Sequence, residues 1–214
     1  MTLNHAAGRL LTALMATAAL CFGALCMVAP AVAGPVIDKP APAFTGTDSN
    51  GKKVSLQDFR GKTVVLEWTN HDCPFVRKHY GSGNMQALQQ EAASDDVVWL
   101  SVVSSAPGRQ GHVSAARANE LTAARKAAPS AVLLDPDGTI GRAYEATATP
   151  HMFVINSKGT LVYKGAIDDK PSANPADIEI ATNYVRAALA ATAAGKKPKP
   201  GATRAYGCSV KYAY

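Results

Sequence analysis

Three short apolar runs set the strongest constraint on how this chain of 214 residues can fold. Each has the length of a strand and is rich in valine and leucine, without strict alternation of apolar and polar residues. Such continuous runs are typical of strands that are covered on both faces. Stretches with helical features separate them, so we expect a parallel sheet with crossover helices. The runs are KTVVLEWT (62–69), DVVWLSVV (96–103) and AVLLD (131–135).

Helix and turn signals complete the expected order of elements. Pro74 can open a helix, because proline at the first helical position lacks only a hydrogen bond that would be missing anyway. The glycines at 81 and 83 interrupt this helix, and Asn84 can cap a second one. Asn50-Gly51 predicts an early hairpin. Further helices are expected at 114–128, 140–144 and 177–194, and a second hairpin pairs 152–155 with 161–167.

The N-terminal segment, 1–33, reads as a secretory signal. Arg9 precedes an apolar run, and Ala31-Val32-Ala33 is a small-x-small cleavage site. The mature chain is therefore expected to begin at Gly34, in the bacterial periplasm and free of the membrane. A retained membrane anchor and a lipid-modified Cys21 or Cys26 are the alternatives.

The charge gives little information about partners. The net charge is +6, and much of the excess lies in a Pro/Lys-rich tail at 195–214, whose lysines at 196, 197 and 199 have no aromatic residue between them. We therefore expect no nucleic-acid partner.

Two cysteines, Cys73 and Cys208, remain after the predicted cleavage. In an oxidising compartment two cysteines are more often paired than free. They stand far apart in the sequence, and the second lies in the extended, semi-rigid tail. Pairing within one chain, pairing between two chains and no pairing all remain open, as does the oligomeric state.

Several motifs between residues 36 and 194 resemble the thioredoxin-like redoxin proteins, which include the alkyl hydroperoxide reductase and thiol-specific antioxidant group. These motifs are KPAPAF, GKKVSLQDFRGKTVVLEW, a Cys-Pro pair that opens a helix, DPDG, and YEATATPHMFVINSKGTLVYKGAID. The resemblance implies an α/β fold of the thioredoxin type, with a central mixed sheet flanked by helices and an N-terminal hairpin. It places the redox cysteine at Cys73 and a cis-proline at Pro150, after Thr149.

Two positions depart from the pattern of the family. Thioredoxins and the periplasmic reductases of cytochrome c maturation carry a second cysteine where this chain has Val76. True peroxiredoxins carry a threonine where this chain has Asn70. A dithiol within the motif is therefore excluded, and peroxidase chemistry is put in doubt.

Cys73 has a setting that favours its thiolate, which is the reacting species of a cysteine. As the N-cap residue it would face the positive end of the helix. Arg77 and Lys78 are expected near the same helix end, and His71 could add a proton or a positive charge, whereas Asp72 opposes the anion unless it turns outward or pairs with Arg77. The polar loop around Cys73 also argues against burial. Trp68 and Asn70 complete the possible supporting residues.

The histidines allow other interpretations. His71 and His79 fit surface or hydrogen-bonded residues, and His151 fits either the site or a packed strand. His71, Cys73 and His79 could be imagined as copper ligands, but Cys73 and His79 lie six apart and cannot share one helix face. We expect no metal and no cofactor.

These observations favour an exported thiol oxidoreductase. Cys73 would attack a peroxide or a disulfide, Cys208 would resolve the intermediate, and an external dithiol donor would regenerate the protein. The distant second cysteine favours an antioxidant peroxidase slightly over exchange with protein disulfides. The alternative from another class is a non-catalytic binding module with a structural disulfide.

Overall fold

The central sheet carries the architecture of this protein. The computed structural model describes residues 1–2 and 34–213, and residues 34–213 belong to one unit. Apart from residues 1 and 2, the predicted signal segment lies outside the described residues. The strands are β1 (Thr45–Asp48), β2 (Lys53–Ser55), β3 (Val64–Trp68), β4 (Val98–Val103), β5 (Ala131–Leu134), β6 (Ala148–Thr149), β7 (His151–Ile155), β8 (Leu161–Gly165) and β9 (Cys208–Ser209). The α-helices are α1 (Pro74–Gly81), α2 (Asn84–Ser94), α3 (Ala115–Ala124), α4 (Thr139–Ala143) and α5 (Tyr184–Ala193), and two 3₁₀ helices are η1 (Leu56–Phe59) and η2 (Pro175–Ile180).

Within residues 34–213, seven strands form one mixed sheet in the order β2-β1-β5-β4-β3-β7-β8. Strands β3, β4 and β5 are parallel, as their apolar runs predict, and the hairpins β1–β2 and β7–β8 extend the sheet antiparallel on either side. The predicted thioredoxin-like α/β fold with an N-terminal hairpin is confirmed.

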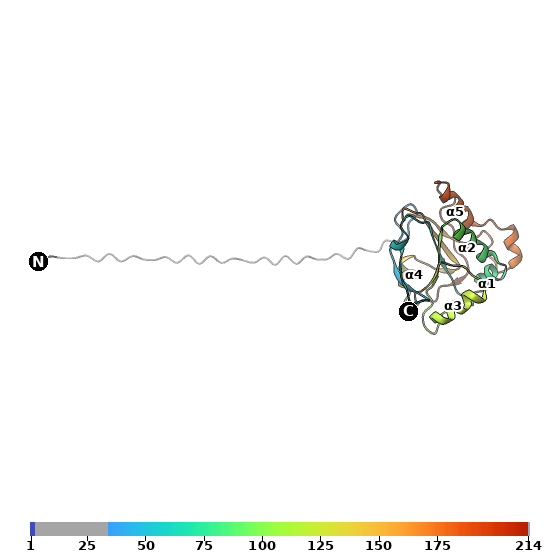
Figure 1. The fold of residues 1–214 in the computed structure, drawn as a ribbon, viewed down its shortest axis with the longest axis horizontal. Coiled ribbons are helices and arrows are strands. Elements are labelled where there is room, and N and C mark those ends of the chain that lie inside the picture. The colour runs from blue at the N-terminus through green and yellow to red at the C-terminus, as the bar shows by residue number, and fades with distance from the viewer. Residues whose placement is uncertain (3–33, 214) are drawn as a thin grey trace. The chain divides into compact units, whose positions relative to one another are not determined.

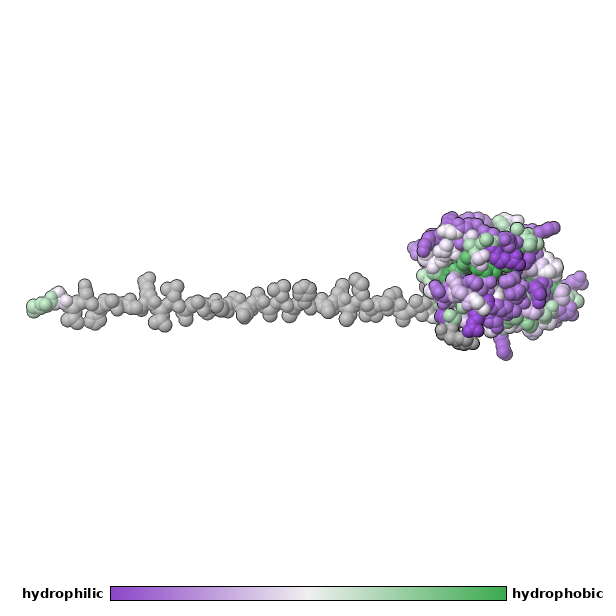
Figure 2. Space-filling view, turned by 90° about the horizontal axis from the view of Figure 1, so that it is seen from below, coloured by the Kyte–Doolittle hydropathy of each residue, from purple (hydrophilic) through white to green (hydrophobic). Residues whose placement is uncertain are grey.

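Both faces of the sheet are covered. Figure 1 shows α1, α2, α3 and α5 on one side and α4 on the other. Val64, Leu66 and Trp68 pack into the cluster on the α4 side, whereas Val65 packs with residues of α1, α2 and α5. This two-sided burial explains why the strand runs are continuously apolar. The face seen in Figure 2 is mainly hydrophilic, and no helix of the described part is long and apolar enough to cross a bilayer.

The predicted last helix is broken in the structure. Instead of one helix over 177–194, η2 ends at Ile180 and α5 begins at Tyr184. Asn183 between them has extended backbone, and its side chain accepts the N–H of Arg186, which makes it an N-cap. The Tyr184 N–H donates to the Ile167 carbonyl. The prediction from periodicity alone missed this capping residue.

The start of α2 also differs by one residue. Gly83 is the N-cap, and Asn84 is the first helical residue. The Asn84 amide instead donates to the His79 ring. Gly83 has a positive φ of 79°, a conformation that glycine adopts without strain.

The tail at 195–213 lies along the domain. The Lys164 N–H donates to the Gly201 carbonyl at 3.1 Å, and the Thr203 N–H donates to the Lys164 carbonyl at 3.0 Å, so the tail runs beside the outer strand β8. Further on, β9 pairs antiparallel with β6, and the Ala106 N–H donates to the Lys211 carbonyl. The tail is therefore held by main-chain hydrogen bonds on both sides of Cys208.

Candidate redox site

Cys73 is the N-cap of α1, and Pro74 is the first helical residue. The preceding turn is built by Asn70, whose carbonyl accepts the Cys73 N–H at 3.1 Å and whose side-chain oxygen accepts the Asp72 N–H at 2.9 Å. Gly111 packs against Asn70 so closely that a Cβ there would lie 2.4 Å from Asn70 Cγ. Asn70 thus shapes the loop that leads from β3 to the cysteine.

Cys73 is fully buried, which corrects the expectation that its polar loop keeps it exposed. The cover comes from segments far away in the sequence. The Thr149-Pro150 bond is cis, as the resemblance implies, and the Cys73 thiol donates to the Thr149 carbonyl at 3.1 Å. The tail lies beside Thr149, since Thr149 and Cys208 are register partners of the β6–β9 pair. The local sequence around Cys73 contains no trace of these long-range contacts.

The structure brings the two cysteines together. Both are free thiols, and Cys208 packs against the apolar cluster that contains Cys73. The Thr149 hydroxyl also donates to the Cys208 carbonyl at 3.3 Å. Cys208 is partly exposed, whereas Cys73 lies beneath it.

The two thiols differ in acidity. Burial alone would raise the pKa of Cys73, but the neighbouring Cys208 side chain, the Val76 N–H at the helix start and the Cys208 N–H together hold that pKa below its ordinary value. Burial and the neighbouring Cys73 thiol raise the pKa of Cys208 to about 11. Cys73 is therefore the thiol of the pair that ionises first.

The predicted charged neighbours are only partly in place. Arg77 is exposed, and its charge acts on Cys208, where it favours the thiolate. Lys78 was expected near the helix start but points into the protein, because its Nζ donates to the Lys170 carbonyl at 3.0 Å and lies 3.6 Å from Asp168 Oδ2. The main support for the Cys73 anion therefore comes from hydrogen-bond donors and not from these two side chains.

His71 and Asp72 face each other. His71 Nε2 lies 3.4 Å from Asp72 Oδ1, so the Asp72 carboxylate turns to His71 and not to Arg77. Burial lowers the pKa of His71, and Asp72 offsets part of this effect.

Trp68 lies away from the reacting atoms. Its indole N–H donates to the Ser104 hydroxyl at 3.0 Å, and its ring packs against Tyr144 and Phe153 in the cluster on the α4 side, whereas Cys73 belongs to the cluster on the opposite face. Its part in the site is to fix the end of β3.

His79 and His151 are packed side chains. His79 is buried between Asn84 and Tyr206, and His151 stacks on Phe153 with a centroid distance of 4.5 Å. Burial lowers the pKa of each to about 4. Lys78 adds to the effect at His79, although Asp168 opposes it.

Because of the lowered pKa values of His79 and His151, we expect the folded protein to lose stability in mild acid. Their folded pKa lies below the unfolded value of about 6.5, so their contribution is fully present above pH 6.5 and is lost as the pH falls towards 4. We expect the free energy of unfolding to drop by roughly 2 to 3 kcal/mol per histidine between pH 7 and pH 4. Urea titrations at several pH values measure this slope. His151→Gln should flatten it and the matched exposed control His112→Gln should not; equal slopes in all three proteins would contradict the assignment.

The sequence prediction missed two buried carboxylates. Glu67 in β3 is fully buried and accepts hydrogen bonds from Trp99 Nε1 at 2.8 Å, Tyr80 Oη at 2.9 Å and Ser101 Oγ at 3.0 Å. Burial raises its pKa, although these donors oppose the shift. Asp168 lies in the loop after β8 and contacts α1 and the tail. A single charge inside the run VVLEW was a usable signal for Glu67, whereas nothing local distinguished Asp168.

A hollow of about 810 Å³ lies beside the tail, lined by residues that neighbour Cys208 in the sequence. His151, Lys164, Arg204 and Gly207 are among its lining residues, which include neither cysteine. Among the residues that the structure describes, no group of three or more His, Cys, Asp or Glu side chains could hold a metal ion. The expectation of no metal and no cofactor stays a prediction.

Comparisons with known proteins indicate the family and the fold of this chain. A family model described as Redoxin matches residues 37–182. The chain is 26% identical over 122 residues to the thiol-disulfide oxidoreductase ResA of Bacillus subtilis (strain 168); the match covers 57% of this chain and 63% of that relative's length.

Two solved structures are similar over most of their length. One is an uncharacterized conserved protein from Geobacillus kaustophilus, with a TM-score of 0.72, 24% identity, and coverage of 83% of this chain and 93% of that chain. The other is the hypothetical protein SMc02350 from Sinorhizobium meliloti 1021, with a TM-score of 0.70, 21% identity, and coverage of 83% and 95%. At this identity they show the fold alone.

Proposed function

Since this chain belongs to the Redoxin family, we propose that it is an exported thiol-disulfide oxidoreductase in which Cys73 and Cys208 alternate between a dithiol and a disulfide. The observation that carries the proposal is that both cysteines meet at Thr149, although they lie in distant parts of the sequence: the Cys73 thiol donates to the Thr149 carbonyl, and Cys208 is the strand partner of Thr149. The similarity to a thiol-disulfide oxidoreductase favours disulfide exchange over peroxide reduction.

The reaction needs two exchange steps. The Cys73 thiolate attacks one sulfur of a substrate disulfide, forms a mixed disulfide and expels the other substrate sulfur as a thiolate, which takes up a proton. The Cys208 thiol then loses its proton and attacks the Cys73 sulfur, which forms the Cys73–Cys208 disulfide and releases the second substrate thiolate. The substrate gains two electrons, the protein loses two, and an external dithiol restores the protein by the reverse exchange.

The unequal acidity of the two thiols fits these roles. Cys73, whose pKa lies below its ordinary value, is the first nucleophile and the better leaving group. Cys208 has a raised pKa, so its attack gains from the nearby positive charges of Lys211 and Arg77. The Thr149 carbonyl next to Pro150 accepts a hydrogen bond from the Cys73 thiol and thereby orients the sulfur.

Peroxide reduction is a second candidate, favoured by the donors around the Cys73 sulfur. In that reaction the Cys73 thiolate takes one oxygen from a peroxide, which leaves as an alcohol or water after taking up a proton. The resulting sulfenic acid condenses with the Cys208 thiol to give the disulfide and water. Asn70, at the position of the peroxiredoxin threonine, is engaged in the loop hydrogen bonds and not aimed at the sulfur.

One experiment separates these functions. The reduced protein is mixed with glutathione disulfide or with hydrogen peroxide in a stopped-flow instrument, and peptides are mapped by mass spectrometry. We expect glutathione disulfide to produce the Cys73–Cys208 disulfide within one chain, faster than it oxidises free cysteine. A fast reaction with peroxide alone would replace the proposal with the peroxidase. Oxidation of Cys73 by neither reagent would leave the non-catalytic binding module.

Export to the periplasm is part of the proposal, supported by the signal pattern in the segment 1–33. Expression of the full chain in a bacterium, followed by cell fractionation and N-terminal sequencing, tests it. A periplasmic protein that starts at Gly34 is expected, and an uncleaved cytoplasmic protein would contradict the proposal.

A further inference from the structure

One face of α1 contacts Tyr206 of the tail. Phe75, Lys78 and His79 follow the i, i+3, i+4 spacing of one helix face. The Phe75 ring meets the Tyr206 ring edge-on at 5.8 Å, Lys78 Nζ lies 5.7 Å from the centre of that ring, and His79 Nε2 lies 3.3 Å from Tyr206 Oη. This helix has Cys73 at its start, and Tyr206 stands two residues before Cys208.

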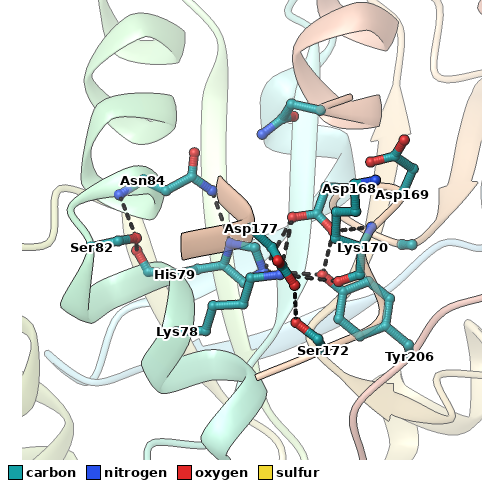
Figure 3. A network of polar contacts seen from close by, with 12 residues as sticks. Lys78, His79, Ser82, Asn84, Asp168, Asp169, Lys170, Ser172, Asp177 and Tyr206 are labelled. Carbon is teal, nitrogen blue, oxygen red and sulfur yellow. Dashed lines mark hydrogen bonds and ion pairs between the residues drawn. The ribbon is translucent and has the colours of Figure 1, made fainter. Parts of the chain in front are cut away.

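Asp168 contacts the hydroxyl of the same tyrosine. Its Oδ1 accepts the Tyr206 hydroxyl at 2.5 Å, while its Oδ2 makes no hydrogen bond among the described residues and lies 3.6 Å from Lys78 Nζ. Figure 3 shows Lys78, His79 and Tyr206 converging on this carboxylate. Asp168, Lys78 and His79 are all buried. Buried charged groups tolerate few arrangements, so these contacts hold Tyr206 in a defined position.

The hydrogen bonds around Tyr206 form a chain in which each group donates to the next, from Asn84 to Asp168. The Asn84 amide donates to His79 Nδ1 at 2.9 Å, so the proton of the neutral His79 ring sits on Nε2 and points to Tyr206 Oη. Tyr206 in turn donates to Asp168. Burial and the Asp168 carboxylate raise the pKa of Tyr206, which keeps this donor protonated.

Gly207 connects Tyr206, which is held by these contacts, to Cys208. It has a φ of 130°, and a Cβ there would lie 2.1 Å from the Thr149 carbonyl oxygen. The tail can pass Thr149 at this distance only without a side chain. Tyr206, Gly207 and Cys208 therefore work as a unit: the first is fixed to α1, the second crosses the cis-proline loop, and the third reaches Cys73.

We propose that Tyr206, held by Asp168 and His79, is the positioning residue that sets Cys208 against Cys73. This inference rests on the proposed function and adds the device that raises the effective concentration of the second thiol. The contacts that lower the pKa of Cys73 include the side chain and the N–H of Cys208, so the same device also supports the first nucleophile.

The test uses Tyr206→Phe, which keeps the ring and removes the hydroxyl. We expect Cys208 to resolve a preformed Cys73–glutathione mixed disulfide about tenfold more slowly, and the Cys73–Cys208 disulfide to be about tenfold less favoured against glutathione, because one hydrogen bond to a carboxylate is lost. Asp168→Ala removes the same bond from the other side and should slow resolution at least as much, because buried Lys78 also loses its neighbouring carboxylate. The pKa of Cys73, measured by pH-dependent alkylation, should rise in both variants.

Tyr212→Phe is the matched control. Its hydroxyl donates to the Ala146 carbonyl at 2.8 Å, on the same tail but away from α1. We expect the resolution rate to change less than about threefold, because this bond is neutral. A wild-type rate for Tyr206→Phe, or equal losses in both tyrosine variants, would overturn the inference while the wild-type disulfide still forms. Absence of that disulfide in the wild-type protein would instead overturn the proposed function.

Discussion

Replacing Cys73 by serine is expected to reduce disulfide exchange by at least about a thousandfold, because a serine hydroxyl is not ionised at neutral pH and cannot replace the thiolate. The rate is measured as reduction of glutathione disulfide or insulin by the protein with an external dithiol. The fold should persist, since the small side chain at this position makes one hydrogen bond, to the Thr149 carbonyl. Residual exchange close to the wild-type rate would show that Cys73 is not the nucleophile.

Cys208→Ser is the natural counterpart to this variant. It retains the attacking thiol at Cys73 but lacks the thiol that releases the substrate. The mixed disulfide between Cys73 and the substrate should therefore accumulate, up to one per chain, and is detected by mass spectrometry under non-reducing conditions. Turnover without a trapped mixed disulfide would exclude Cys208 from the cycle.

Replacing Glu67 by alanine is expected to lower the free energy of unfolding by about 3 to 5 kcal/mol. The change leaves Trp99 Nε1, Ser101 Oγ and Tyr80 Oη without their buried acceptor and opens a cavity beside β3. Glu67→Gln keeps the volume and one acceptor oxygen, so we expect a smaller loss of about 1 to 2 kcal/mol. Urea unfolding at pH 7 measures both.

Glu120 provides the control for this pair of variants. It is exposed and pairs with Arg117 on the surface of α3. Glu120→Ala should change the free energy of unfolding by no more than about 0.5 kcal/mol. If Glu67→Ala were as mild as this control, the hydrogen bonds to Glu67 would contribute little to stability.

The sequence was sufficient for the sheet because the relevant signals are local. The run at 62–69 is apolar at every position that β3 buries except Glu67, and Asn50-Gly51 marks the turn between β1 and β2. Pro74 fixes the start of α1 in the same way. Composition and spacing suffice wherever an element is defined by its own residues.

The site was harder to predict because its contacts join distant segments. Cys73 lies in a polar loop yet is buried, since its cover comes from Thr149 and from the tail. Lys78 has a helical position that suggests the helix start, yet Asp168 draws it into the interior. The sequence left the pairing of the two cysteines open, because the route of the tail depends on main-chain hydrogen bonds and on Gly207, which leave no periodic pattern.

The pairing of residues 201–203 with β8 also bears on solubility. Strand β8 is the last strand of its sheet, and the tail occupies main-chain groups of Lys164 that would otherwise be open to another chain. Unpaired outer strands are templates for aggregation. A truncation made to remove Cys208 would therefore also unmask this surface, and self-association of the shortened protein could be mistaken for a redox effect. Point substitutions in the complete chain avoid that confusion.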